Sequence, residues 1–518
     1  MSVLIDARRR PARHAPVTPW GRGALWLGTL GAVCVAIGSY GAGATRYRGG
    51  VLAALGWEAY SYGHGAGIAS ALCVSGMVAM ILAWGLLGRA VNAEAAPLPV
   101  LRRCLVGWVA PLLVAAPLFS RDVYSYLMQG AMLRDGFDPY SEGAAANPGV
   151  YLLEVSHDWR NTTTPYGPLH LLLGKVITSV APENVTAGVA LYKAISLAGF
   201  VAIAAGVGAL ARRMNVPPAG ALWLSVANPL MIFHLVAGMH NESVMVALVT
   251  WGLVWAYKGK MLPAVALISL AVTLKATAVF ALPFVVWMAT RRLAGARALP
   301  RGRAGYSCAF VLSGIWVTAV LLIILEAVTV LAGSNWLWVT QISGNSKVIN
   351  PLAVPSLLTS LAVPPLRLVD PDVSANAIVT ALRMVCSVLM LVGLVVVWWR
   401  YRHTDKGAIT GTAAAYLVVV TLNSVTLPWY YSSLIALLGV VGLSTTQTRW
   451  AVGLSAFVAL LFMGSGNHYL YKPVWLLLGT VLGLATAFIA LPPRRRVTAP
   501  SPARAASLHA PGARGGHR

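Results

Sequence analysis

The groups best able to do chemistry in this chain are carboxylates at the ends of long apolar runs. Asp122 follows one such run, where a carboxylate can touch the bilayer, reach water and act as a general base on a hydroxyl. Its neighbour Arg121 allows a second interpretation, in which the two charges form a solvated pair at the interface. Glu242, in the sequence His240-Asn241-Glu242, is the only acid between residues 183 and 326. A carboxylate there is costly without partners, so a functional contact is favoured over a helix cap.

Further polar groups lie in turns or interrupt apolar segments. Asp138 lies in the turn sequence DGFDPY, where it either caps the turn or binds hydroxyls of a substrate. Lys275 divides an apolar run and either snorkels to the surface or pairs with a phosphate. The turn around Tyr166, TPYGP, starts the next apolar segment and would support a site.

Two other segments mix aromatic rings with amide or basic groups. Trp336, Lys347 and Asn350 lie in one of them, and Trp429 and Tyr430 lie in the other. Such mixtures suit the faces and hydroxyls of sugars, although aromatic belts at the membrane interface produce the same pattern.

The elements that must position these groups are membrane helices. The chain has 518 residues, of which 58% are hydrophobic and 10% are charged, and its mean hydropathy is +0.72. Soluble proteins carry about 25% charged residues, so a soluble enzyme is excluded. A net charge of +24 in so apolar a chain indicates cytoplasmic loops beside anionic lipid rather than nucleic acid. The five scattered cysteines predict neither a disulfide framework nor a zinc site.

Basic residues predict which loops are cytoplasmic. The Arg-rich N-terminus, Arg89 to Arg103 and each later basic cluster fall inside if residues 166–181 do not cross the membrane, and we choose that alternative. Residues 120–165, which hold six of the 15 acids, and residues 332–375 then lie outside. The polar groups around Asp122, Glu242, Lys275 and Trp429 share this outer face, which predicts a convergent site there.

The predicted fold class is an all-α polytopic membrane protein of about 14 spans. The spans are expected at residues 24–44, 66–88, 104–119, 185–211, 218–238, 243–257, 261–275, 277–290, 306–331, 376–399, 408–426, 429–446, 450–464 and 473–491. Residues 1–23 form a basic cytoplasmic N-terminus, residues 24–491 a transmembrane catalytic domain, and residues 492–518 a disordered basic cytoplasmic tail.

Several motifs together resemble the actinobacterial alpha-1,6-mannopyranosyltransferases of the MptA/MptB type. The similarity extends over nearly the whole membrane part, and KVINPLAVPS with the short 211–217 and 258–261 loops is more similar to MptA. The matching segments are FSRDVYSYLMQGAMLRDGFDPY (119–140), TTPYGP (163–168), ALWLSVANPLMIFHLVAGMHNE (221–242), LKATAVFALPF (274–284), KVINPLAVPS (347–356) and LPWYYS (427–432).

The resemblance implies a GT-C glycosyltransferase fold in the plasma membrane, with its active site on the outer, periplasmic face. It implies a decaprenyl-phosphate-mannose donor and a lipomannan or phosphatidylinositol-mannoside acceptor, used in building the alpha-1,6-mannan backbone of lipomannan and lipoarabinomannan. The family's catalytic aspartate corresponds to Asp122. Because the donor's mannose is beta-linked and the product alpha-linked, one displacement with inversion and a single base suffice.

We therefore expect each candidate residue to have a defined role. Asp122 is the catalytic base, and no cofactor or metal site is expected, although the outer acids would also suit a divalent cation. Donor-phosphate partners are Lys275, His240 and Lys347, and substrate contacts are Arg121, Tyr124, Asp138, Tyr166, Asn241, Glu242, Trp336, Trp429 and Tyr430.

Two alternatives remain open from the sequence. A lipid-linked-sugar transporter would also place polar groups beside a lipid-facing cavity, but transporters usually show matching halves with broken helices, and no such repeat is visible here. A related transferase could use another acceptor, because the acceptor groove has no sequence motif.

Overall fold

The computed structural model describes residues 18–93, 97–295, 302–344 and 349–493, which form helices joined by loops. The N-terminal half contains α1 (Pro19–Ala42), α2 (Val51–Leu55), η1 (Glu58–Ser61), α3 (Gly63–Ala93), α4 (Pro97–Leu112), α5 (Asp122–Arg134), η2 (Ala144–Ala146), η3 (Leu152–Glu154), η4 (His157–Trp159), α6 (Pro168–Val180), α7 (Val185–Met214), α8 (Pro218–Ser225), α9 (Pro229–Met231), η5 (Ile232–Ala237) and α10 (Glu242–Tyr257). The C-terminal half contains α11 (Met261–Leu274), η6 (Ala276–Ala281), α12 (Leu282–Ala294), α13 (Arg303–Ala332), α14 (Trp338–Gly344), α15 (Val354–Arg367), α16 (Ala375–Arg400), α17 (Asp405–Leu422), η8 (Pro428–Tyr431), α18 (Ser432–Leu438), α19 (Thr445–Leu461) and α20 (Pro473–Ala490).

The described helices confirm a polytopic membrane protein, with fewer full-length spans than expected. Seven of them are long and apolar enough to cross a bilayer, namely α1, α3, α7, η6 with α12, α13, α16 and α20. An eighth is formed if α8 and the α9–η5 segment, bent by 58° at their junction, count as one span. Other expected spans correspond to shorter helices, such as α10 and α11 with only 16 and 14 residues, whereas a perpendicular crossing needs about 20. The count of about 14 spans therefore stays a prediction.

Segment 166–181, which is predicted not to cross the membrane, forms a short helix. It forms α6, a 13-residue apolar helix that begins at Pro168, and about 20 residues are needed to span the hydrocarbon core. Gly167 lies directly before this helix, and its N–H donates to the carbonyl of Leu274 at 3.2 Å. The turn therefore fixes the start of α6 against the end of α11.

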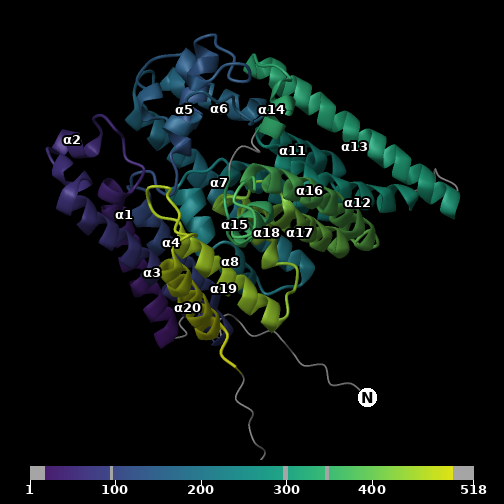
Figure 1. Cartoon of the computed structure of the whole chain (residues 1–518). Coiled ribbons are helices and arrows are strands. Elements are labelled where there is room, and N and C mark those ends of the chain that lie inside the picture. The colour runs from purple at the N-terminus through teal and green to yellow at the C-terminus, as the bar shows by residue number, and fades with distance from the viewer. Residues whose placement is uncertain (1–17, 94–96, 296–301, 345–348, 494–518) are drawn as a thin grey trace, which may run out of the picture.

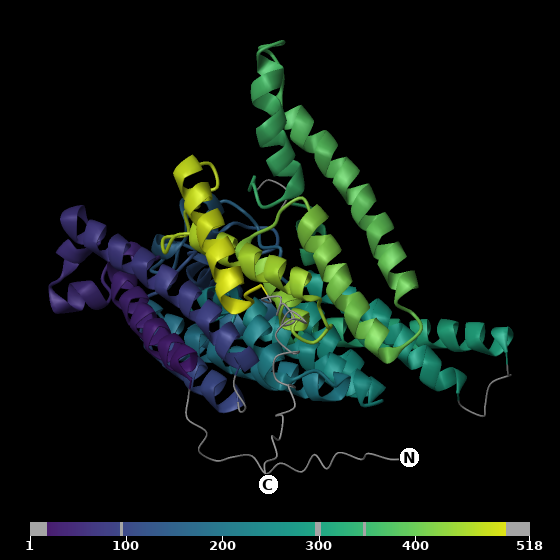
Figure 2. The same cartoon turned by 90° about the horizontal axis from the view of Figure 1, so that it is seen from below.

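The helices form a packed body from which one pair projects. In Figure 1, α1, α3, α4 and α20 lie together on one side, α7, α8 and α18 lie centrally, and α13 extends along the other side. Figure 2 shows α15 and α16, in green, standing away from the body. Only 11% of the most apolar stretch of α16 is buried, compared with 56% for α7, so α16 presents most of its apolar surface to the surroundings.

Two segments that the sequence assigns to the cytoplasmic side meet in the structure. Asp405, at the start of α17, accepts hydrogen bonds from Arg291 at 2.6 Å and from Arg292 at 2.7 Å, both at the end of α12. This ion-paired cluster ties α12 and α17 together at one end of the body.

Segment 120–165, which the sequence predicts to lie outside, folds onto α6 as a small lobe at the top of Figure 1, and we call it the outer lobe after that prediction. Its helix α5 packs against α6 at Gly130 and Gly174, where a Cβ on Gly130 would lie 2.1 Å from the backbone carbon of Gly174. Only glycine permits this approach, which brings the two backbones into contact. The close packing fixes α5, and with it Asp122, relative to α6.

Candidate active site

Asp122 begins α5 in a strained and tightly held segment. Its N–H donates to Ser120 Oγ at 3.0 Å, and the preceding Phe119 has a φ of 68°, which is rare for a residue with a side chain. The Phe119 N–H donates to the carbonyl of Gly464 at 2.7 Å. Such strain persists only where the surroundings enforce it, so the start of α5 has a fixed position.

His240 reaches Asp122 from a break between two helices. The chain leaves the π-helical turn η5, Met239 adopts a φ of 55°, and His240 Nδ1 then lies 3.4 Å from Asp122 Oδ2. The His240 ring stacks on Trp429 of η8, with centroids 3.8 Å apart and planes inclined by 17°. π-Helical turns are frequent at functional sites because they redirect a side chain.

The surroundings of Asp122 keep its carboxylate ionised. Burial alone would raise the pKa of Asp122, but the contact with His240 and the positive charge of Lys275 outweigh it and lower the pKa below its ordinary value. From the sequence, the neighbouring Arg121 is the cation that would keep Asp122 ionised. In the structure, His240 and Lys275 have this role instead. A carboxylate that is 18% exposed and ionised can accept a proton from a group in the cavity.

A second ionic pair lies beside the first. Glu242 at the start of α10 is 1% exposed, and its Oε1 accepts a hydrogen bond from Lys275, which lies between α11 and η6. The Lys275 ammonium lies 4.2 Å from the centroid of the Tyr430 ring and 5.5 Å from that of Tyr166. The pair thus places a cation, with its counter-ion, against two tyrosine rings.

The site opens into a cavity of about 710 Å³. Asp122, Tyr126, Trp429 and Tyr430 are among its walls, as is the hairpin turn 465–468 near the C-terminus. A neighbouring cavity of about 380 Å³ is lined by Lys275 and shares Tyr166 and Tyr430 with the first. The two tyrosines therefore form a boundary between the base and the cation.

Three buried polar atoms of the segment His240-Asn241-Glu242 lack a hydrogen-bond partner within the described parts of the chain. They are Nε2 of His240, Oδ1 of Asn241 and Oε2 of Glu242. Buried polar atoms without a partner are uncommon in folded proteins and require an explanation. A polar ligand that enters the two cavities would supply one.

His170 belongs to the site, although the sequence analysis assigned it no role. This residue of α6 is buried, and its Nε2 lies 3.0 Å from Gln129 Oε1, while its Nδ1 lies 3.2 Å from Asn241 Nδ2. The Tyr166 ring packs against it with centroids 4.4 Å apart. The signal in the sequence was the polar His170 inside an apolar segment directly after the TPYGP turn.

The hairpin turn Ser465-Gly466-Asn467-His468 is another part of the site that the sequence analysis missed. Gly466 has a φ of +94°, and a Cβ on it would lie 3.3 Å from the Ser120 backbone. The turn therefore lies against the residues that lead into Asp122. Its polar, glycine-containing composition between two apolar runs was the available signal.

The structure brings together most of the predicted site residues but not all of them. Asp122, His240, Asn241, Glu242, Lys275, Tyr166, Trp429 and Tyr430 meet around the two cavities.

Arg121 lies at the cavity wall, but its guanidinium holds the fold together. It donates to Glu154 Oε2 at 3.1 Å, to the Glu154 carbonyl and to the carbonyl of Thr45, and it stacks over Tyr47 at 3.7 Å. These contacts join the outer lobe to the α1–α3 connection. These contacts give Arg121 a structural role, and its substrate contact stays a prediction.

Three other predicted contacts lie away from the main cavity. Tyr124 is on the opposite face of α5, where its hydroxyl donates to the carbonyl of Ala44 at 2.8 Å. Asp138 caps its turn by accepting from the Tyr140 N–H at 3.0 Å, and Trp336 is 40% exposed and donates to Glu326 at 2.8 Å. Lys347 lies outside the described residues.

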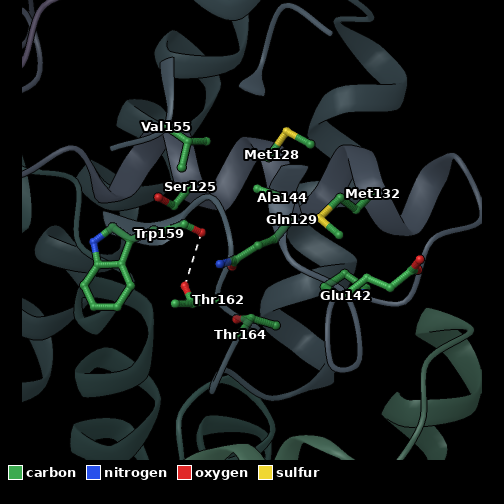
Figure 3. A pocket seen from close by; sticks show the side chains of 11 residues that line it. Ser125, Met128, Gln129, Met132, Glu142, Ala144, Val155, Trp159, Thr162 and Thr164 are labelled. Atoms are coloured by element: carbon green, nitrogen blue, oxygen red, sulfur yellow. Dashed lines mark hydrogen bonds between the residues drawn. The ribbon is translucent and has the colours of Figure 1, made fainter. Parts of the chain in front are cut away.

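A small hollow beside α5 adjoins the main cavity, with which it shares Ser125, Gln129, Trp159 and Thr162. Figure 3 shows Gln129 pointing from α5 toward the loop that carries Trp159 and Thr162, where the Thr162 hydroxyl donates to the Trp159 carbonyl at 3.2 Å. The hollow holds only about 10 Å³, which is room for about one water molecule. It is therefore too small to hold a sugar.

Comparison with known proteins agrees with this arrangement. Residues 25–291 match the family described as "Alpha-(1->6)-mannopyranosyltransferase, N-terminal domain", and residues 355–492 match "MptB C-terminal domain". Alpha-(1->6)-mannopyranosyltransferase A of Corynebacterium glutamicum is 50% identical over 88% of this chain and 95% of its own length. The protein of the same name from Mycobacterium tuberculosis is 35% identical over 92% of both chains.

The B-type relative is more distant. Alpha-(1->6)-mannopyranosyltransferase B of Corynebacterium glutamicum is 28% identical over 78% of this chain and 70% of its own length, in agreement with the predicted greater similarity to the A type. The first match covers α5 to η6, which carry Asp122, His240, Glu242 and Lys275, and the second covers η8 and the hairpin turn 465–468. The chain therefore belongs to the MptA/MptB family of alpha-(1->6)-mannopyranosyltransferases and is a glycosyltransferase.

Proposed function

We propose that this protein is an inverting mannosyltransferase of the GT-C class that uses a polyprenyl-phosphate-mannose donor at the outer face of the plasma membrane. The acceptor is the alpha-1,6-mannan backbone of a lipid-anchored mannan such as lipomannan. The observation that carries the proposal is the ionised Asp122 at a cavity wall, beside a second cavity lined by the cation of Lys275. This arrangement supplies one base and one site for an anionic leaving group.

The reaction in this proposal is one displacement at the anomeric carbon. The acceptor 6-hydroxyl oxygen attacks this carbon and gives its proton to Asp122, while the bond from the carbon to the phosphate oxygen breaks. Polyprenyl phosphate leaves with the electron pair as an anion, and the configuration inverts from beta to alpha. Protonated Asp122 then returns its proton to solvent through the cavity.

The second cavity is the proposed place for the donor phosphate. Lys275 lines it together with Tyr430 and with Ile342 of α14, and a fixed cation near the departing oxygen lowers the barrier to its release. Because Glu242 already pairs with Lys275, the phosphate would share the ammonium, whose three N–H groups can serve both anions. The sparsely buried helices α13 and α16 would offer an apolar surface to the polyprenyl chain.

The membership in a transferase family favours this function over lipid transport. A transporter would not need an ionised base at the floor of a cavity, whereas a glycosyl transfer to a hydroxyl does. The site constrains the identity of the acceptor less than that of the donor, because a hydroxyl group on another carrier molecule could give its proton to Asp122 in the same way.

The proposal is tested by an in vitro assay with purified protein. We expect transfer from polyprenyl-phosphate-mannose to a short alpha-1,6-mannoside, with a new alpha-1,6 linkage, and no transfer from GDP-mannose. In sealed right-side-out vesicles, a membrane-impermeant mannoside supplied outside should be extended. Transfer from GDP-mannose without a lipid donor would contradict the donor, and extension only in inverted vesicles would contradict the orientation.

The contact between His240 and Asp122 gives a prediction about pH. In the parent, the lowered pKa of Asp122 keeps the base ionised, so kcat/KM should stay nearly constant as the pH falls from about 7 to about 5. In His240→Phe, the ring still stacks on Trp429 but no longer lowers the pKa of Asp122. Protonation of the base then begins at higher pH, and kcat/KM should fall within this window.

His234→Phe is the matched control for this measurement. The centroid of the His234 ring lies 5.6 Å from that of His240 and 5.7 Å from that of Trp429. Of the two histidines, only His240 contacts Asp122. The control should keep the pH profile of the parent. Identical profiles in His240→Phe and the parent would contradict the role of His240 in setting the charge of Asp122.

A further inference from the structure

The cavity of about 710 Å³ that Asp122 lines is called the catalytic cavity below. A third cavity adjoins it on the side opposite Lys275. It encloses about 480 Å³, and Thr45, Arg46, Tyr47 and Ser61 line both it and the catalytic cavity. The α1–α3 connection, the segment after α4 and the first turns of α7 form its walls. We call it the side cavity. Because four residues belong to both cavities, a chain-like ligand can extend from one into the other.

The side cavity combines tyrosine rings and hydroxyl groups with aliphatic side chains such as Leu52, Leu113 and Val114. Tyr40, Tyr47, Tyr62 and Tyr124 line it, as do the side chains of Glu58, Ser61 and Thr186. Aromatic rings offer flat apolar faces to the C–H side of a pyranose, and carboxylate and hydroxyl oxygens accept from its hydroxyls. The lining therefore suits a neutral, polyhydroxylated ligand.

The two cations of the side cavity are already occupied, which argues against an anionic ligand. Arg46 contacts Glu154 at 3.3 Å and donates to Thr186 at 3.0 Å. Lys193 donates to the carbonyls of Leu112, at 3.1 Å, and Ala115, where it satisfies the C-terminal end of α4. Glu58 adds a negative charge to the lining, which would repel a phosphate and accept from a sugar.

We propose that the side cavity binds the mannose units that precede the acceptor's terminal residue, so that the enzyme recognises a chain rather than a single sugar. This inference rests on the proposed function and names its acceptor subsites. With the terminal 6-hydroxyl at Asp122, the preceding units pass Arg46 and Tyr47 and reach Tyr62 and Glu58. Acceptor affinity then rises with chain length until the side cavity is filled.

The test compares acceptors of different length on parent and variant proteins. Methyl alpha-mannoside reaches only the catalytic cavity, whereas a methyl alpha-1,6-tetramannoside fills both. For the parent, we expect the KM of the tetramannoside to be lower than that of the monosaccharide. Tyr62→Ala should raise the tetramannoside KM about tenfold, as expected for loss of one aromatic face, and leave kcat and KM for the monosaccharide unchanged.

Two further variants make this result specific. Tyr62→Phe keeps the ring and should retain the parental preference for length. Trp57→Ala removes an exposed aromatic side chain from the same connection, outside the lining of the side cavity, and should behave as the parent does. Glu58→Gln should weaken only the longer acceptor.

The outcomes that would overturn the inference are distinct. Equal KM values for both acceptors in the parent, or an unchanged length preference in Tyr62→Ala, would mean that the acceptor does not use the side cavity. A requirement of the parent for an anionic phospholipid that Tyr62→Ala abolishes, with no change in length preference, would assign the cavity to a lipid headgroup instead. Failure of the parent to extend any mannoside from the lipid donor would overturn the proposed function and this inference with it.

Discussion

Asp122→Asn should lower the rate constant of mannosyl transfer by a factor of about 10²–10⁴, the usual effect of losing a general base. The amide has nearly the shape of the carboxylate and can keep the contacts with His240 and Tyr126, but it cannot take the acceptor's proton. The Ser120 hydroxyl still accepts from the backbone N–H of residue 122, so the start of α5 is preserved. Single-turnover rates measured with saturating donor and acceptor isolate this chemical step.

Asp138→Asn is the matched control for the base. Asp138 lies on the same outer lobe, but it caps a turn and accepts from Asn335 at 2.9 Å rather than facing the cavity. Its amide variant should stay within about threefold of the parental rate, because the turn can keep one acceptor oxygen. If Asp122→Asn, produced and folded like the parent, kept more than about a tenth of the parental rate, Asp122 would not be the base. Glu242 would then be the next carboxylate to examine.

Lys275→Met should give the second large effect, on both stability and turnover. The variant leaves the carboxylate of Glu242 buried without its partner, and removing one member of a buried ion pair costs about 3–5 kcal/mol. Glu242→Gln instead leaves the Lys275 ammonium buried without its partner, and we expect a similar loss of stability. The measurement is the thermal unfolding midpoint of the detergent-solubilised protein, together with the rate of transfer.

The double variant Lys275→Met/Glu242→Gln separates folding from chemistry. Because both charges are absent, it should regain most of the thermal stability that either single variant loses. If Lys275 also stabilises the departing phosphate, the double variant should remain slower than the parent by about 10²–10³, as for loss of one electrostatic contact to a developing anion. A stable double variant with parental turnover would show that the pair is structural only.

The sequence determined the class of the protein and identified Asp122 as the candidate base. Long apolar runs separated by basic clusters predicted a polytopic membrane protein, and seven of the expected spans correspond to long apolar helices. The apolar runs and the basic clusters are local features of the sequence, because a bilayer selects helices by the composition of about 20 consecutive residues. Asp122 was identifiable for the same reason, since a carboxylate at the end of an apolar run is visible without knowledge of its neighbours.

The tertiary structure decided the number of full-length spans and the partners of each polar group. Length and bending, rather than apolarity, distinguish α10, α11 and the α8–η5 segment from the other helices. These features depend on how the π-helical turn and the short helices pack, because neighbouring helices must satisfy the backbone groups that a break exposes. Apolar runs of similar composition therefore gave different structures.

The same reason explains which site residues the sequence misassigned. Arg121 is adjacent to Asp122 in the chain, yet its guanidinium binds Glu154, and the charge of Asp122 is set by His240 and Lys275. His170 and the hairpin turn 465–468 enter the site from segments whose composition gave only weak signals. The interaction of two charged groups depends on their separation in space and on the medium between them. Sequence composition supplied the reactive groups of this protein, and only the packing of α5, α6, η5 and η8 decided which of them face one another.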